Sequence, residues 1–548
     1  MLESTPTLDA DQARVPRISV ASHPAAASIL TADAIAFVAE LHRRFEPRRR
    51  GLLDARVGRQ RLIDAGDRPG FAAETAHIRA GVWQVAAPPK DLEERKVELT
   101  GPVTRPEMLA ALNSGADVFM ADFEDVLSPT WDHIVDGQRN VRDAYAGTLA
   151  VADGENVTDL TDEPATLVVR TRGWHLTERH CTIDGEPVSA ALFDFGLCAF
   201  HNARQALDRG TGPYFYLAKL ENRLEARLWR DVFHYAESAL ELDRGSIRAT
   251  VLIEHVLAAF EMDEILYELR EHATGLHTGN WDYLFSIVKT FRRHERYLLP
   301  DRADINVRVP FMRAFTELLV STAHRRGAHA IGGMSGVVPD VAHPERTEAA
   351  LRQVLADKRR EAGDGFDGTR IAHPSIVEVA VHEFDKVLHD RPHQVGRQRD
   401  DVYVTPGDLL AVASTKGSVT EDGVRRNMRI AVQYLASWLD GEANVELDHH
   451  LEDTAMAELC RSQIWQWIHH RVEMSNGRTL TPELAHQLAD EETATLRAEL
   501  GDDVWTAGRF DEARTLFDES ALADELPDFV TLAAYERLWR PPPGDLPP

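Results

Sequence analysis

Short apolar segments alternate with helical stretches through the middle of the chain, between about residues 96 and 375 of 548. The apolar segments have the length of strands, and residues 256–269 show the amphipathic spacing that separates most of them. The predicted strands lie at residues 97–101, 118–125, 166–173, 214–221, 249–254, 276–282, 328–335 and 369–374. Eight strand–helix units favour an α/β fold, a (β/α)8 TIM barrel of ~250 residues.

An open, doubly wound sheet is the alternative to a barrel. It would carry a glycine-rich phosphate loop after an early strand, and neither GxGxxG nor GxxxxGK[ST] occurs there. The barrel is therefore favoured. A hairpin-like segment with an Asp-Gly turn at Asp184 lies within residues 174–200, and we expect it to be a small insert on the barrel.

The regions on either side of the predicted barrel are patterned differently. Residues 1–30 are rich in Ala, Pro, Ser and Thr, whereas residues 31–55 place apolar side chains at helical spacing. Beyond a polar, proline-containing linker at 389–402, most of the chain is again helical. We expect an N-terminal arm and helical region over 1–95, the barrel over 96–385 and a C-terminal helical domain over 386–548.

The charge balance argues against some partners. Asp and Glu outnumber Lys and Arg by 89 to 61, whereas binding to nucleic acid or to an anionic membrane needs basic surface. No apolar run approaches the ~18 residues of a membrane span, and the first residues lack a signal-peptide pattern. Cys181, Cys198 and Cys460 are widely spaced, which fits a reducing compartment. We expect a cytoplasmic protein without nucleic-acid or membrane partners.

Polar side chains follow the predicted strands, where a (β/α)8 barrel carries its active site. They are Asp122, Glu124, Asp125, Arg170, Arg172, Lys219, Glu221, Glu254, Asp282, Ser335 and His373. Glu254 and Asp282 end adjacent predicted strands, so they could share one hard cation such as Mg²⁺. For any single residue a solvated or ion-paired loop position is the commoner case. The recurrence on several strands is what favours a site.

Residues 270–285 read Arg-Glu-His-Ala-Thr-Gly-Leu-His-Thr-Gly-Asn-Trp-Asp-Tyr-Leu-Phe. Gly275 and Gly279 permit tight turns or a close approach of the backbone to a ligand. Asp282 follows in a segment apolar enough to be buried, and a buried carboxylate is costly unless it is paired, hydrogen-bonded or bound to a metal. A ligand site and a capping aspartate are both consistent with this pattern.

Asp453 stands three residues before Met456, on the face of an apolar helical stripe that continues through Cys460, Ile464 and Trp467. The spacing favours a helix N-cap, for which Asp is well suited. Asp453 could instead act as a base if that end of the helix covers the mouth of the barrel.

Residues 270–285 also resemble the signature of the malate synthases, in particular the shorter A type. Further segments are similar to that family in the same order along the chain, and they lie at 119–125, 128–131, 169–175, 251–254, 331–334 and 462–467. One departure is His277, where the family usually has Asn. We expect this change to alter local packing without removing a ligand.

The resemblance implies a barrel with an N-terminal helical clasp and a C-terminal all-helical plug. It implies condensation of acetyl-CoA with glyoxylate and water to malate and CoA, the malate synthase step of the glyoxylate cycle, in a monomer or small homo-oligomer. By matching motif, Glu254 and Asp282 hold the Mg²⁺ cofactor, Arg172 is the catalytic arginine and Asp453 is the catalytic base. The residues that seat glyoxylate are then Arg172, Gly279, Trp281 and Asp282, and Glu124 and Asp125 are acids behind the metal ligands.

The residue types suit this reaction. The methyl group of acetyl-CoA is a very weak acid, so a carboxylate base needs a cation where the enolate charge develops, and arginine is always charged. One rival hypothesis is a barrel similar to the malyl-CoA or citramalyl-CoA lyases, which are shorter and lack a domain with Asp453. Another is a non-catalytic scaffold, which would have lost one of the four implied residues. For a phosphate-binding barrel, Gly332 and Gly333 are only a weak hint.

Overall fold

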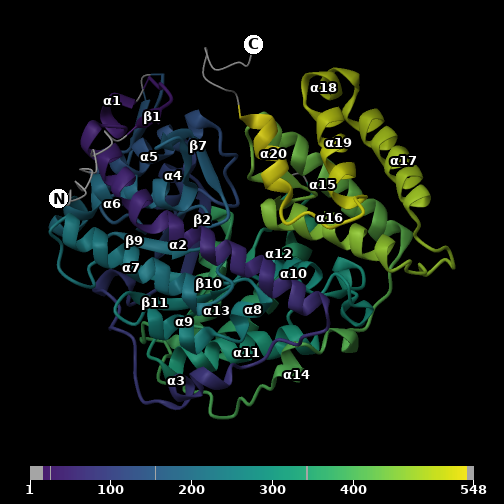
Figure 1. Cartoon of the computed structure of the whole chain (residues 1–548), viewed down its shortest axis with the longest axis horizontal. Coiled ribbons are helices and arrows are strands. Elements are labelled where there is room, and N and C mark those ends of the chain that lie inside the picture. The colour runs from purple at the N-terminus through teal and green to yellow at the C-terminus, as the bar shows by residue number, and fades with distance from the viewer. Residues whose placement is uncertain (1–16, 25, 155, 341–342, 540–548) are drawn as a thin grey trace, which may run out of the picture.

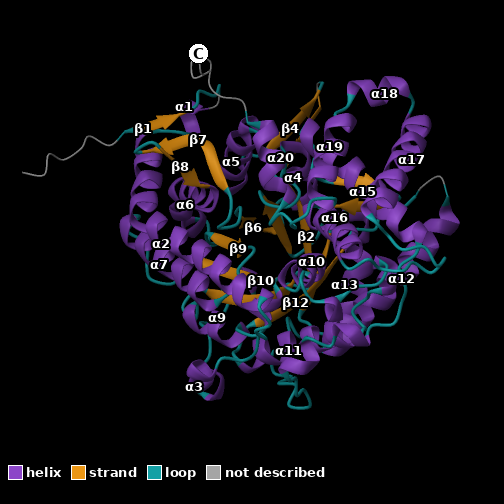
Figure 2. Ribbon diagram, turned by 45° about the vertical axis from the view of Figure 1, so that its right-hand side comes forward, coloured by secondary structure: helices purple, strands orange, loops and turns teal. Residues whose placement is uncertain are grey.

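The computed structural model describes residues 17–24, 26–154, 156–340 and 343–539. Its centre is a closed barrel of eight parallel strands in the order β10-β11-β12-β13-β2-β3-β6-β9, so the predicted (β/α)8 fold is confirmed. The barrel strands are β2 (Val97–Pro102), β3 (Val118–Asp122), β6 (Thr166–Arg170), β9 (Tyr214–Leu217), β10 (Arg248–Ile253), β11 (Ala273–Thr278), β12 (His329–Ser335) and β13 (Gly368–Ile371). Figure 2 shows these strands at the centre of the molecule with helices around them.

Each barrel strand is buried on both faces, which explains why the strands appear in the sequence as continuous apolar runs. Along β3, Val118 and Met120 belong to the barrel interior, whereas Phe119 and Ala121 belong to the core between strands and helices. This alternation follows from the two-residue period of a strand. The outer helices include α4 (Arg105–Leu112), α5 (Trp131–Tyr145), α6 (Ala190–Asp208), α7 (Arg223–Ala239), α8 (Val256–Ala259), α9 (Met262–Glu268), α10 (Asn280–Thr290), α11 (Pro310–Arg325), α12 (Pro344–Asp364) and α13 (Val377–Leu388).

A long N-terminal helix, α2 (Ala32–Asp64), lies across the outside of the barrel against α6 and α7 (Figure 1). The Thr31 hydroxyl caps it by accepting from the amide of Ala34 at 3.2 Å. The predicted hairpin insert is present as β7 (Thr177–Ile183) and β8 (Glu186–Ser189), and β1 (Ile18–Val20) pairs with β7. The hairpin ends at Ser189 and α6 begins directly afterwards, so the excursion is shorter than the sequence suggested.

The C-terminal helices form a second hydrophobic core of their own. They are α15 (Glu421–Asp440), α16 (Thr454–His469), α17 (Pro482–Leu500), α18 (Asp502–Ala507), α19 (Phe510–Ala521) and α20 (Val530–Leu538). A small hairpin of β14 (Val445–Leu447) and β15 (His450–Glu452) leads into α16, which packs against α10 of the barrel. This contact holds the start of α16 over the carboxyl ends of the strands. Among the described residues, no helix is both long and apolar enough to span a membrane.

Candidate active site at the mouth of the barrel

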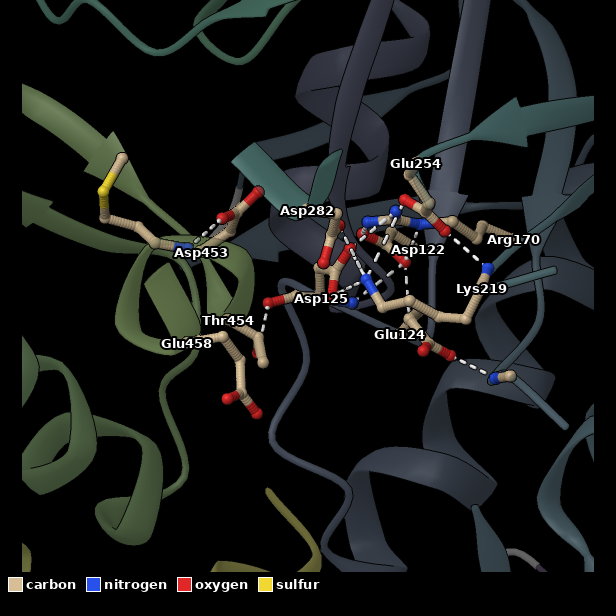
Figure 3. A network of polar contacts seen from close by, with 12 residues as sticks. Asp122, Glu124, Asp125, Arg170, Lys219, Glu254, Asp282, Asp453, Thr454 and Glu458 are labelled. Atoms are coloured by element: carbon tan, nitrogen blue, oxygen red, sulfur yellow. Dashed lines mark hydrogen bonds and ion pairs between the residues drawn. The ribbon is translucent and has the colours of Figure 1, made fainter. Parts of the chain in front are cut away.

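Buried charged side chains converge at the carboxyl ends of the strands (Figure 3). Asp122 and Arg170 are the last residues of β3 and β6, and Glu254 directly follows β10. Asp282 lies in the first turn of α10, three residues after the N-cap Gly279. The strand predicted at 276–282 therefore ends earlier than expected, at Thr278, because the chain turns into a helix there.

Three carboxylates of this group are close enough to bind one cation. Asp125, Glu254 and Asp282 each offer an oxygen, and these oxygens lie within 4.8 Å of one another. The Lys219 ammonium lies among them, with Nζ 2.7 Å from Asp282 Oδ2, 3.1 Å from Asp125 Oδ1 and 3.8 Å from Glu254 Oε2. The predicted partners Glu254 and Asp282 thus face the same space, together with Asp125.

The donor set fits a hard divalent cation. Carboxylate oxygens are the ligands that Mg²⁺ takes in proteins, usually one or two of them beside water and substrate oxygens. Glu254 Oε2 is buried and accepts no hydrogen bond from any described residue. Gly279 keeps the approach open, because a Cβ at this position would lie 2.4 Å from the Cβ of Glu254.

Burial and neighbouring charges shift the pKa values of the acids at this site. Burial raises the pKa of Asp282 well above its usual range, Lys219 opposes that shift, and Glu254 and Asp125 add to it. Burial likewise raises the pKa of Glu124 to about 8, against the effect of Lys219. For Asp125 burial is outweighed by Arg170 and Lys219, which hold its pKa at about 2. A bound cation would favour the ionised form of all these acids.

Asp453 combines the two roles that the sequence left open. It is the N-cap of α16, where Oδ1 accepts from the amide of Met456 at 3.2 Å. It also lines the same cavity as Asp125, Gly279, Trp281 and Asp282. Burial raises its pKa to about 6, Asp125 raises it further, and Arg170, Lys219 and Arg370 lower it. A carboxylate with this pKa is a stronger base than an ordinary aspartate.

A direct bond holds the helical domain on the barrel beside this residue. The amide of Thr454 donates to the carbonyl oxygen of Asp125 at 3.1 Å, and the Thr454 hydroxyl donates to the same oxygen at 3.0 Å. Tyr434 of α15 also reaches that carbonyl, at 3.2 Å. The position of Asp453 relative to the carboxylates is therefore fixed by hydrogen bonds between the two domains.

Arg172 is buried and paired with two carboxylates. Its guanidinium donates to Asp194 Oδ1 at 2.8 Å and to Glu178 Oε2 at 2.9 Å. It borders a small cavity that Asp125, Lys219 and Asp282 also line, whereas Asp453 lines the larger cavity on the other side of these residues. Both acidic partners belong to elements outside the barrel strands, the insert and α6. Arg172 therefore joins the hairpin insert to the barrel.

Arg170 contacts two of the carboxylates at the mouth directly. Its Nε donates to Asp122 Oδ1 at 2.7 Å, and its Nη1 lies 2.7 Å from Asp125 Oδ2. Its positive charge also lowers the pKa of Asp453. The sequence placed both arginines at the same strand end, and residues two apart on a strand point to the same side, so their spacing could not distinguish them.

The start of α10 borders the cavity. Gly279, Asn280, Trp281 and Asp282 all line it, and the first amides of a helix have no partner within the helix. Together with the positive end of the helix dipole, they form a seat for an anion such as a carboxylate. This is the place where the sequence predicted Gly279 and Trp281 to contact substrate.

The cavity extends well beyond the carboxylates. Its volume is about 670 Å³, enough for a large ligand. Basic side chains line it together with acidic ones, and the basic ones are Arg302, Lys358, Arg360, Arg370 and Arg426. Sequence reasoning missed this group, because its members come from separate loops and helices of the barrel and the C-terminal domain and share no motif.

Comparisons with known proteins cover nearly the whole chain. Three family models match in order, described as "Malate synthase, N-terminal domain" over residues 17–77, "Malate synthase, TIM barrel domain" over 166–412 and "Malate synthase, C-terminal" over 418–538. A malate synthase of Streptomyces clavuligerus is 51% identical over 517 residues, which is 93% of this chain and 96% of the relative. Malate synthase A of Escherichia coli is 45% identical over 512 residues, 93% of this chain and 96% of the relative. The glyoxysomal malate synthase of Brassica napus is 45% identical over 522 residues, 93% and 92% of the two chains. The chain belongs to the malate synthase family.

Proposed function

We propose that this chain is a Mg²⁺-dependent malate synthase that condenses acetyl-CoA with glyoxylate and hydrolyses the malyl-CoA product to malate and CoA. The observation that carries the proposal is one cavity lined by Asp125 and Asp282, the helix start at Gly279, and Asp453. Membership in the family supports the reaction, and the site geometry supports the roles of individual residues.

Glu254 and Asp282 would hold Mg²⁺, with Asp125 next to them. When bound there, the ion would polarise the glyoxylate aldehyde and offset the negative charge of the substrate. The amides at the start of α10 would hold the glyoxylate carboxylate by hydrogen bonds. The Lys219 ammonium lies among the carboxylates, 2.7 Å from Asp282, and limits the repulsion between these acids.

Asp453 would remove a proton from the methyl group of acetyl-CoA. With its pKa at about 6, most of it is ionised at neutral pH, yet it binds a proton more strongly than an exposed aspartate. Burial also keeps water from competing for that proton. Because Asp453 caps α16, its side chain is held in a fixed orientation rather than sampling rotamers in solvent.

Arg170, rather than Arg172, would stabilise the developing enolate. Both guanidiniums are paired with two carboxylates, but the partners of Arg170 include Asp125 of the candidate cation site, whereas Arg172 is held by Asp194 and Glu178 from α6 and the insert. Arg170 is buried, and a fixed, fully charged donor in a buried site stabilises developing negative charge far better than the same group in water. We therefore assign Arg172 a structural role.

The basic side chains of the cavity would bind CoA, which carries several phosphate groups. In a chain whose net charge is −28, a generally acidic surface repels such a co-substrate. Arg302, Arg360 and Arg426 would offset that repulsion by pairing with its phosphates. The three cysteines are free and buried.

A thiol-release assay tests the proposal. We expect CoA to appear only when acetyl-CoA, glyoxylate and Mg²⁺ are all present, and malate to form in equal amount. Release of CoA at the same rate without glyoxylate would identify a thioesterase instead. Malyl-CoA that accumulates without hydrolysis would identify a lyase-like activity and contradict the second half of the proposed reaction.

A further inference from the structure

A second group of metal-ligand side chains lies at the opposite end of the barrel from the mouth. His234 is near the end of α7, and Glu271 and His272 directly precede β11. One ligand atom from each of these three residues lies within 4.8 Å of the other two. Because β11 rises ~3.3 Å per residue, this cluster is roughly 20 Å from Asp282 at the far end of the strand.

The buried His272 has an imidazole nitrogen without a hydrogen-bond partner among the described residues. Its side chain is 0% exposed, and Nδ1 lies 2.8 Å from the carbonyl oxygen of Ile247. Since a carbonyl oxygen only accepts, Nδ1 carries the hydrogen and Nε2 keeps its lone pair. Nε2 is buried and has no hydrogen-bond partner among the described residues. One ring nitrogen donating to a backbone carbonyl while the other is free is the arrangement of a metal-ligating histidine.

His234 and Glu271 complete the cluster. The rings of His234 and His272 are 5.1 Å apart, and His234 Nε2 lies 3.3 Å from Glu271 Oε2 without the geometry of a hydrogen bond. Among the described residues, the unpartnered imidazole nitrogens of His234 and His272 and the Glu271 carboxylate thus face one another as possible ligands.

The charges around the cluster leave room for a cation. Arg244 and Arg230 come near His234, but Arg244 lies 3.4 Å from Glu237, and Arg230 pairs with Asp231 and Glu268 at 2.7 Å. Glu271 makes no ion pair with lysine or arginine in the part of the chain that the structure describes. Its carboxylate is therefore free to neutralise part of the charge of a bound ion.

We infer that His234, Glu271 and His272 form a second metal site, for a borderline divalent cation such as Zn²⁺. Two imidazoles and one carboxylate, with water as a fourth ligand, match tetrahedral Zn²⁺ and are unsuited to Mg²⁺, which prefers oxygen ligands. A bound ion would tie the end of α7 to the starts of β10 and β11. Its role would be to stabilise the barrel, and turnover at the other end would not depend on it.

Chelator-treated full-length protein tests this inference, with Mg²⁺ kept in excess to occupy the carboxylates at the mouth. Zn²⁺ binding is measured by competition with a chromogenic chelator, and Co²⁺ absorption reports the coordination. We expect one Zn²⁺ per chain beyond any bound at the mouth, a higher thermal midpoint with Zn²⁺, and a tetrahedral Co²⁺ spectrum. His234→Ala should weaken binding by at least about tenfold and abolish the thermal shift.

A matched variant separates this site from general histidine effects. His382 is an exposed histidine on α13, so His382→Ala should bind Zn²⁺ as the wild type does. His234→Ala and His382→Ala should both keep full turnover, because neither residue lies near the mouth. Equal Zn²⁺ affinity in the wild type and in His234→Ala would overturn the inference, as would an octahedral Co²⁺ spectrum that persists in His234→Ala.

Discussion

Two layers of buried polar side chains lie inside the barrel. In the first, which we call the closed layer, the charges are balanced by partners within the layer; in the second, the open layer, acids are in excess. Near the amino ends of the strands, Arg95 pairs with Glu98 and hydrogen-bonds to Tyr216, Thr250 and Thr274. At the mouth, six acids face fewer cations, and they are Asp122, Glu124, Asp125, Glu254, Asp282 and Asp453. There Glu254 Oε2 lacks a hydrogen bond. Buried charge alone therefore does not mark a site, whereas an excess of one sign with an unsatisfied oxygen does.

Of the substitutions in the open layer, Asp453→Asn should have the largest effect on activity. Asn cannot accept a proton from acetyl-CoA, so we expect kcat to fall by roughly 10²–10⁴-fold. Asn is as good an N-cap as Asp, so α16 should remain intact. Steady-state kinetics and binding of Mg²⁺ and glyoxylate check this. Near-normal turnover would leave Asp453 with its capping role alone.

Arg170→Lys and Arg172→Lys compare an arginine of the open layer with one of a closed network. Lysine keeps the charge but loses the planar pair of donors. We expect Arg170→Lys to lower kcat by roughly 10²–10³-fold. Arg172→Lys should mainly lower the thermal midpoint, because its contacts to Asp194 and Glu178 are structural. The reverse pattern in kinetics and thermal unfolding would restore Arg172 as the catalytic arginine.

These two arginines also show where sequence-based prediction reached its limit. The strands were recognisable because both faces are buried, and the pairing of Glu254 with Asp282 followed from the adjacency of β10 and β11. Arg170 and Arg172 share a strand end, and only tertiary contacts with α6 and the insert separate them. The position of Asp453 over the mouth depends on the packing of α16 against α10, which no local pattern encodes.

The pH dependence should distinguish catalysis from stability at Asp453. As a base, it acts only when ionised, so kcat/KM should fall about tenfold per pH unit below about 6. Stability changes in the opposite direction. Folding raises the pKa of Asp453 from 3.8 to about 6. Ionisation of this group therefore lowers the free energy of unfolding by up to about 3 kcal/mol as the pH rises through that window.

Asp453→Asn serves as the control for that stability difference. The variant should gain thermal stability over the wild type at pH 7 and lose most of that gain near pH 4, when measured without Mg²⁺. A constant difference in thermal midpoint across this range would show that the pKa of Asp453 is not raised by folding.

Removal of the metal, which should stop turnover, should have only a small effect on thermal stability, confined to the open layer. A ligand at about 100 times its Kd stabilises a protein by about 2.7 kcal/mol, so Mg²⁺ should raise the thermal midpoint by a few degrees and EDTA should reverse the rise. Glu98→Gln provides the contrast, because it should destabilise the closed layer equally with and without Mg²⁺. Glu254→Gln should lose the rise in thermal midpoint with Mg²⁺, whereas Glu98→Gln should keep it. The same rise in both variants would contradict the difference between the two layers.

Calorimetric titration of Mg²⁺ into the wild type, Asp453→Asn and Glu254→Gln tests the central claim most directly. The excess acid at the mouth should bind one Mg²⁺ per chain in the wild type and in Asp453→Asn, with little binding in Glu254→Gln. The same Mg²⁺ affinity in Glu254→Gln as in the wild type would contradict the assignment of the open layer as the metal site.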